Sequence, residues 1–126
     1  MKYRISLVED DLTMRILMKT LLEMEGFEVL TFEGGSEDFI EKMKQFVPHF
    51  ILMDFHLKNF SGVELLRLLR TELRPPFPKI LMISGEDRKD QCLEEGADGF
   101  LLKPFMPAEL IGWLHEREKS IDLQEN

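Results

Sequence analysis

Acidic and polar side chains follow the short apolar runs of this 126-residue chain. Glu9 and Asp10 follow the first run, Asp54 ends the third, Ser84 follows the fourth and Lys103 follows the fifth. Carboxylates that gather from two strand ends repel one another, and a hard divalent cation relieves that repulsion. Mg²⁺ suits such a site because it takes a few oxygens and keeps its waters. With the hydroxyl and the ammonium, the set predicts a cradle for a phosphoryl group.

Asp54 is the candidate nucleophile of this set. It lies in Phe50–Phe55, which is nearly all apolar and therefore reads as a central strand buried on both faces. A carboxylate at the end of a central strand stands in the middle of the crevice where the other groups would meet. We therefore expect an Asp54 oxygen to attack the phosphoryl group.

The elements that must position these groups alternate along the chain. Strands are expected at 4–8, 27–32, 50–55, 79–83 and 99–102, and helices at 12–25, 36–46 with Ser36 as N-cap, 62–73, 88–95 and 107–120. Five strand–helix units in a row predict an α/β fold with a mostly parallel sheet and helices on both faces. Ligands of such sheets bind at the carboxyl ends of the strands, where the polar groups fall.

Composition narrows the class of partner. There are 24 acidic residues against 16 basic ones, a net charge of −8, so we expect no direct binding of nucleic acid.

The single cysteine, Cys92, cannot form an internal disulfide and predicts a cytoplasmic protein with a buried thiol. No apolar run approaches the ~20 residues that span a bilayer. We expect one domain at 1–120, followed by a polar C-terminal tail at 121–126.

Four motifs carry a resemblance to a known family. They are Leu7-Val8-Glu9-Asp10-Asp11, Ile51-Leu52-Met53-Asp54, Met82-Ile83-Ser84-Gly85 and Gly96-Ala97-Asp98-Gly99-Phe100-Leu101-Leu102-Lys103-Pro104-Phe105. In this order and spacing the chain resembles the receiver domain of bacterial two-component response regulators over essentially its whole length. It looks most like the stand-alone, chemotaxis-type members. The resemblance implies a flavodoxin-like three-layer sandwich with strand order 2-1-3-4-5 and five helices.

The resemblance also implies a cation site. Asp10 would hold Mg²⁺ (or Mn²⁺) directly, Glu9 would hold it through water, and the backbone carbonyl of His56 would be a further ligand. Asp54 would be both a ligand and the phosphoacceptor.

A second group of residues would respond to phosphorylation. Lys103 would pair with the phosphoryl group, and a cis Lys103–Pro104 peptide would aim it inward. The Ser84 hydroxyl would turn toward the phosphoryl group, and Phe100 would move inward with it as a switch aromatic.

Plainer interpretations stand beside these roles. Glu9 and Asp10 could only cap the following helix, although Asp11 or Thr13 could do so without them. Asp54 could be a turn residue, Ser84 a strand-end hydroxyl and Lys103 a surface lysine. Phe100 could be static core. Trp113 on the last helix could be boundary core or a partner contact.

The chain also departs from the family pattern. His56 lies two positions after the phosphoacceptor, where a polar residue such as Asn is common. Its side chain would overhang the site. His56 could be a solvated loop histidine that contributes only its backbone carbonyl, or His56 and Glu86 could modulate how long the phosphoryl group survives. Lys58 replaces a usual proline, and Ser61 replaces a usual acid. The segment 84–96 is short by roughly one helical turn, so its helix should be short and charged.

The sequence therefore predicts a signal relay. A sensor histidine kinase or a histidine phosphotransfer protein would donate to Asp54, and a conformational switch would alter binding of a downstream protein at 99–102 and the last helix. The chain would act as a monomer or a phosphorylation-dependent dimer, and as a switch rather than an enzyme. The alternatives are a pseudo-receiver that works without phosphorylation and a haloacid-dehalogenase-type phosphatase. The latter needs a second Asp at the position of His56.

Overall fold

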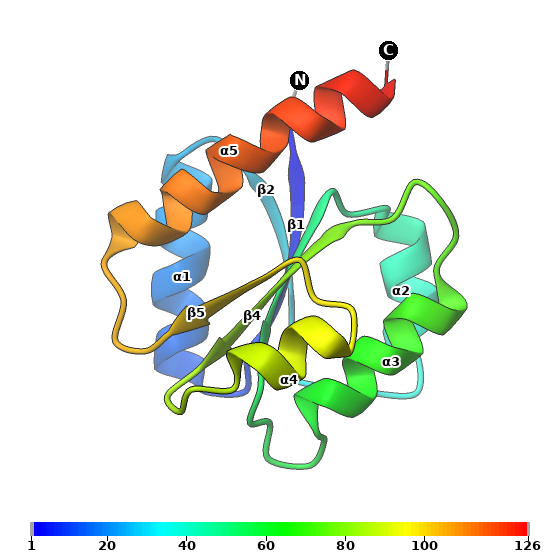
Figure 1. Cartoon of the computed structure of the whole chain (residues 1–126), viewed down its shortest axis with the longest axis vertical. Helices are drawn as coiled ribbons and strands as arrows, with labels where there is room; N and C mark the ends of the chain where they lie inside the picture. Colours follow the sequence, from blue (N-terminus) through cyan, green and yellow to red (C-terminus); the bar gives the residue numbers. More distant parts are fainter. Residues whose placement is uncertain (1, 126) are drawn as a thin grey trace.

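The computed structural model describes residues 2–125. These residues form ten alternating elements (Figure 1), which are β1 (Arg4–Val8), α1 (Leu12–Met24), β2 (Glu28–Phe32), α2 (Phe39–Phe46), β3 (Phe50–Asp54), α3 (Gly62–Glu72), β4 (Lys79–Ser84), α4 (Lys89–Glu94), β5 (Gly99–Leu102) and α5 (Pro107–Glu125). The strands form one parallel sheet in the order β2-β1-β3-β4-β5, which confirms the predicted topology. Among the described residues, no helix is long and apolar enough to cross a membrane.

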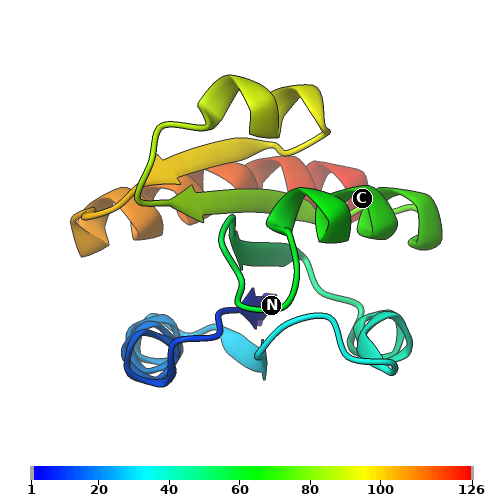
Figure 2. The ribbon, with the colours of Figure 1, turned by 90° about the horizontal axis from the view of Figure 1, so that it is seen from below.

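The helices cover both faces of the sheet (Figure 2). Alternation along β3 divides the core into two clusters, because successive side chains of a strand point to opposite faces. Phe50 and Leu52 pack with residues of α1 and α5, whereas Ile51 and Met53 pack with residues of α2, α3 and α4. All four side chains are fully buried. The nearly continuous apolar sequence of β3 thus reflects burial on both faces.

Strand register determines which groups meet at the carboxyl edge of the sheet. Val8 of β1 pairs with Met53 of β3, and Asp54 pairs with Ile83 of β4. The residue after β1, the last residue of β3 and the last residue of β4 are therefore neighbours. These are Glu9, Asp54 and Ser84.

Side chains cap the N-termini of two helices, α1 and α3. The Asp11 carboxylate accepts a hydrogen bond from the backbone N–H of Met14 at 2.9 Å, so Asp11 caps α1 and the preceding acids are not needed for that role. The Ser61 hydroxyl accepts from the backbone N–H of Glu64 at 3.4 Å at the start of α3. Ser61, which departs from the usual acid, is thus the N-cap of α3.

Some element limits differ from the predictions. The prediction that Ser36 caps α2 is wrong: its hydroxyl donates to the Asp38 carboxylate at 2.6 Å, and the helix begins only at Phe39. The last helix extends to Glu125 instead of ending near residue 120, because Ile121 is buried in the α1–α5 core cluster. The expectation of a short charged helix is confirmed, since α4 has 6 residues.

Candidate functional site

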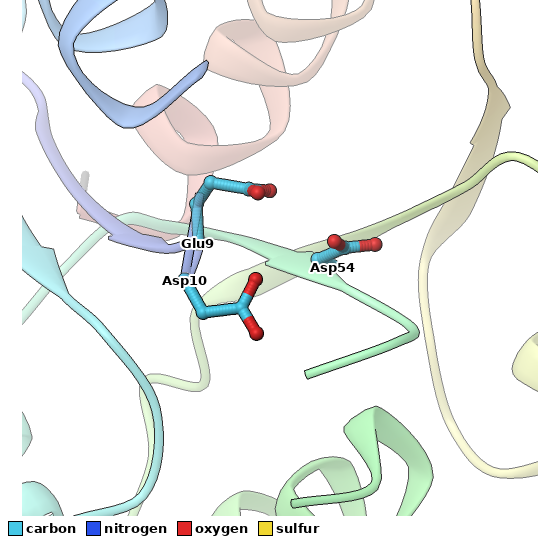
Figure 3. Close-up of side chains that lie close together, drawn as sticks. All are labelled: Glu9, Asp10 and Asp54. Atoms are coloured by element: carbon cyan, nitrogen blue, oxygen red, sulfur yellow. The ribbon is translucent and has the colours of Figure 1, made fainter. Parts of the chain in front are cut away.

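Three carboxylates converge where β1 and β3 end. Glu9 and Asp10 follow β1, Asp54 ends β3, and one oxygen of each lies within 4.8 Å of the others. Figure 3 shows the three side chains close together, with Glu9 and Asp10 extending toward the end of β3, where Asp54 lies. Glu9 is 3% exposed and Asp54 is 8% exposed, whereas Asp10 is half-buried at the mouth. Hard oxygen donors gathered in this way fit Mg²⁺ or Mn²⁺.

Lys103 is the cation that faces these carboxylates. It follows β5, and its Nζ lies 3.3 Å from Asp54 Oδ2 and 3.7 Å from Glu9 Oε2. The Lys103 backbone N–H donates to the Ser84 carbonyl at 2.7 Å, which fixes the start of the loop against β4. The Lys103–Pro104 peptide is cis. One ammonium thus contacts two of the three acids, Glu9 and Asp54.

Burial, together with the neighbouring charges, raises the pKa of Glu9 to about 7. Burial is the main cause, and repulsion by Asp54 adds to it. The Lys103 ammonium and the hydrogen bond from the Asp11 backbone N–H act in the opposite direction. A divalent cation bound here would favour the charged form of Glu9.

Backbone and arginine contacts hold the acids in place. Arg15 Nη1 of α1 donates to the Glu9 carbonyl at 2.8 Å, and the Lys58 backbone N–H donates to Asp10 Oδ2 at 2.5 Å. These two contacts join the loop after β1 to α1 and to the loop after β3. Sequence patterns did not point to Arg15 or to the Lys58 backbone, because both contacts depend on the fold and not on residue spacing.

Gly62 allows a close approach beneath the phosphoacceptor candidate. A Cβ at this position would lie 2.6 Å from the Asp54 carbonyl oxygen and 2.8 Å from the Phe55 Cα. The Gly62 N–H donates to the Phe55 carbonyl at 3.0 Å. The start of α3 is thus packed directly against the backbone that carries Asp54.

The β4 side of the site is formed by Ser84 and two exposed side chains. The Ser84 hydroxyl is fully buried and accepts from the Glu86 N–H at 3.0 Å. Across the mouth, His56 Nε2 lies 3.7 Å from Glu86 Oε1. The His56 N–H donates to Asp54 Oδ1 at 3.4 Å. The structure therefore brings both predicted modulating residues together beside Asp54.

Aromatic residues line the β5 side. Phe100 is half-buried and packs against the α2–α4 core cluster. Trp113 lies over Gly99, where an added Cβ would be 2.5 Å from the indole nitrogen. The Arg117 guanidinium stands 4.4 Å from the indole centroid. Trp113 therefore belongs to the boundary of the core.

The comparisons with known proteins agree with this geometry. Residues 5–115 match the response regulator receiver domain. The receiver domain (CheY-like) of Methylobacillus flagellatus superposes with a TM-score of 0.82 at 27% identity, covering 92% of this chain and 98% of that one. The beryllofluoride-activated receiver of Klebsiella pneumoniae RstA gives 0.79 at 27% identity, covering 89% and 95%.

Curated relatives extend beyond the matched region. The phosphate regulon transcriptional regulatory protein PhoB of Pseudomonas aeruginosa is 38% identical over 113 residues, which cover 87% of this chain and 49% of PhoB. The DNA-binding response regulator MtrA of Mycobacterium tuberculosis is 28% identical over 124 residues, covering 97% and 53%. The chain thus spans about half the length of these relatives. With the fold, the acidic site and the match over residues 5–115, the chain belongs to the response regulator receiver domain family.

Proposed function

We propose that this chain receives a phosphoryl group on Asp54 from a phosphohistidine of a partner protein. An Asp54 carboxylate oxygen attacks phosphorus, the bond from phosphorus to the imidazole nitrogen breaks, and the imidazole leaves to take up a proton from water. The product is an acyl phosphate on Asp54. The observation that carries the proposal is the convergence of Glu9, Asp10 and Lys103 on that one carboxylate.

A divalent cation fits the acidic side of this site. Glu9, Asp10 and Asp54 would hold Mg²⁺ or Mn²⁺, together with the His56 backbone carbonyl. When bound, the cation neutralises charge on the phosphoryl oxygens. Lys103 would bind a further phosphoryl oxygen from the opposite side, and its present contact with Asp54 supports this role.

The response to phosphorylation would pass through Ser84 and Phe100. A new anion beside Asp54 attracts the buried Ser84 hydroxyl, which now accepts from Glu86. Movement of Ser84 opens space on the β4–β5 side, into which the half-buried Phe100 can turn. The surface of β5 and α5 would then change its affinity for a downstream protein in the cytoplasm.

An apolar groove beside the site supports a helical protein as the donor. The groove has a volume of about 650 Å³, lies between α1 and the loop after β5, and includes Lys103. Met14, Leu17, Leu21 and Met24 of α1 follow the 3-4-3 spacing of a helix-packing seam. Leu17 is 61% exposed.

Leu17→Glu should therefore slow transfer from a phosphorylated histidine phosphotransfer protein, while phosphorylation by acetyl phosphate stays unchanged. Equal effects on the two reactions would contradict docking of the donor in this groove.

The phosphoacceptor proposal is tested with Mg²⁺ and acetyl phosphate. Intact-mass measurement should show one phosphoryl group on the wild-type chain and none on Asp54→Asn. Asp10→Asn should react far more slowly. Asp11→Asn is the matched control, because an exposed N-cap tolerates Asn and should leave phosphorylation unchanged. If the wild-type chain gains no adduct, the chain acts as a binding module without phosphorylation.

A further inference from the structure

A second surface of interest lies where β3 and β4 begin, at the end of the sheet opposite the acidic site. Five apolar residues come together there from the end of α2 and the loop before β4; they are Val47, Leu73, Pro75, Pro76 and Phe77, and we call them the amino-edge patch. Val47 is 51% exposed and Phe77 is 46% exposed. Three adjoining hollows of about 620, 310 and 130 Å³ surround the patch.

The surroundings of the amino-edge patch are basic, although the chain as a whole carries a charge of −8. The residues that line the three hollows include Arg4, Lys44, Arg70, Arg74 and Lys79 but only one acid. That acid is Asp98, which already accepts hydrogen bonds from a lining arginine and from a backbone N–H of β4.

Three of these basic side chains are available to a partner. Within residues 2–125, Lys44, Arg74 and Lys79 form no ion pair. Opposite charges across an interface steer association and favour one class of partner over another. An acidic partner therefore suits this surface, and a basic one does not.

The backbone of Val47 gives an independent reason to regard the patch as functional. Val47 ends α2 in the left-handed region, with φ 52° and ψ 65°. Glycine or asparagine is usual there, because a β-branched side chain clashes with the backbone. Arg4 Nε fixes the turn by donating to the Phe46 and Val47 carbonyls at 3.0 and 2.9 Å. The fold thus holds an exposed isopropyl group in an unfavourable conformation, as is typical of binding sites.

We propose that the amino-edge patch docks an acidic segment of a partner protein that also carries exposed Leu or Phe side chains. The apolar side chains would enter the hollows beside Val47 and Phe77, and the acids would meet Lys44, Arg74 and Lys79. The patch lies at the edge of the sheet away from Asp54. A protein bound there would leave the phosphorylation site and the α1 groove open.

The probe is a synthetic peptide that alternates Asp or Glu with Leu or Phe, titrated into isotope-labelled protein. Amide NMR shifts should change at positions 42–49 and 70–79, and the affinity should fall with added salt. A peptide with Lys in place of the acids, and one with Ser in place of the apolar residues, should not bind. Shifts at residues that line none of the three hollows, with none at Arg4, Asp98 or Ile121 or in 42–49 and 70–79, would overturn the proposal, and so would binding of the basic peptide.

Two substitutions separate binding from folding. Val47→Asn should raise the melting temperature by about 4 °C, because asparagine tolerates the left-handed backbone conformation better than valine does. The same substitution should weaken peptide binding at least about fivefold. Arg74→Glu should weaken peptide binding and reduce the salt dependence of the affinity. Leu68→Asn is the matched control, because Leu68 is an exposed residue of α3, at 39%, that lines none of the three hollows. Unchanged affinity in Val47→Asn contradicts the docking, and so does binding to phosphatidylglycerol vesicles in place of the peptide.

Discussion

Glu9 shows how one side chain can link proton and metal binding. In the folded, metal-free protein its pKa is raised from 4.5 to about 7, mainly by burial, so the neutral form is favoured. Because the folded protein holds the Glu9 proton more tightly than the unfolded chain does, the proton stabilises the fold. This stabilisation is fully present below pH 4.5 and is lost as the pH rises through about 7. A bound divalent cation needs the Glu9 carboxylate in its charged form, so it would reverse the preference of Glu9 for the neutral form.

Mg²⁺ should consequently stabilise the chain more at pH 8 than at pH 6, a window centred on the raised pKa of about 7. The measurement is the increase in melting temperature on adding Mg²⁺ at each pH. In Glu9→Gln the increase should be smaller and nearly independent of pH across this window. An unchanged pH dependence in Glu9→Gln would show that another group controls it.

The contact between His56 and Glu86 should control access of water to the acyl phosphate. The two side chains face each other at 3.7 Å across the mouth of the site. His56→Asn should shorten the lifetime of phosphorylated protein by about threefold, because the shorter side chain no longer covers the path of the attacking water. The decay of the phosphorylated species by intact mass measures this effect.

Glu86→Gln provides the companion variant. If the two side chains act as one cover, the double variant should decay no faster than His56→Asn alone. A lifetime that is unchanged in His56→Asn rules out this role, and His56 would then contribute only its backbone.

At the scale of elements, the loop after β3 is held against α3 by a glycine. Gly62→Ala should destabilise the fold by about 2 kcal/mol, because the new methyl group would meet the backbone of Asp54 and Phe55 at under 3 Å. Phosphorylation by acetyl phosphate should slow with it. Gly112→Ala on α5 is the matched control. It meets no atom within 4 Å and should stabilise the helix by about 0.8 kcal/mol.

Chemical denaturation of the Gly62→Ala and Gly112→Ala proteins measures the two free energies of unfolding. A Gly62→Ala protein as stable and as reactive as the wild type would mean that the loop shifts freely, so that α3 does not position Asp54.

Local patterns predicted most elements because their causes are local. Apolar runs and helical spacing marked the five strands and five helices, and Asp11 was recognised among the possible caps of α1. The errors arose from tertiary contacts. Ser36 failed as a cap because its hydroxyl bonds to Asp38, and α5 continues because Ile121 enters the core.

At the scale of the whole molecule, charge is divided between the two edges of the sheet. Glu9, Asp10 and Asp54 meet at the carboxyl edge, while basic residues surround the amino-edge patch. The acidic site could be predicted, since its members end strands that a parallel sheet must align. The patch could not, because Val47 and Phe77 become neighbours only through the packing of two separate loops.

The central claim is that Asp54 carries the phosphoryl group, and borohydride reduction tests it most directly. Borohydride converts an aspartyl phosphate into homoserine, which peptide mass spectrometry can locate. After treatment with acetyl phosphate and Mg²⁺, we predict homoserine at position 54 alone, and none when Mg²⁺ is removed by a chelator. Homoserine at position 10, or an unmodified Asp54 in the presence of Mg²⁺, would contradict the account.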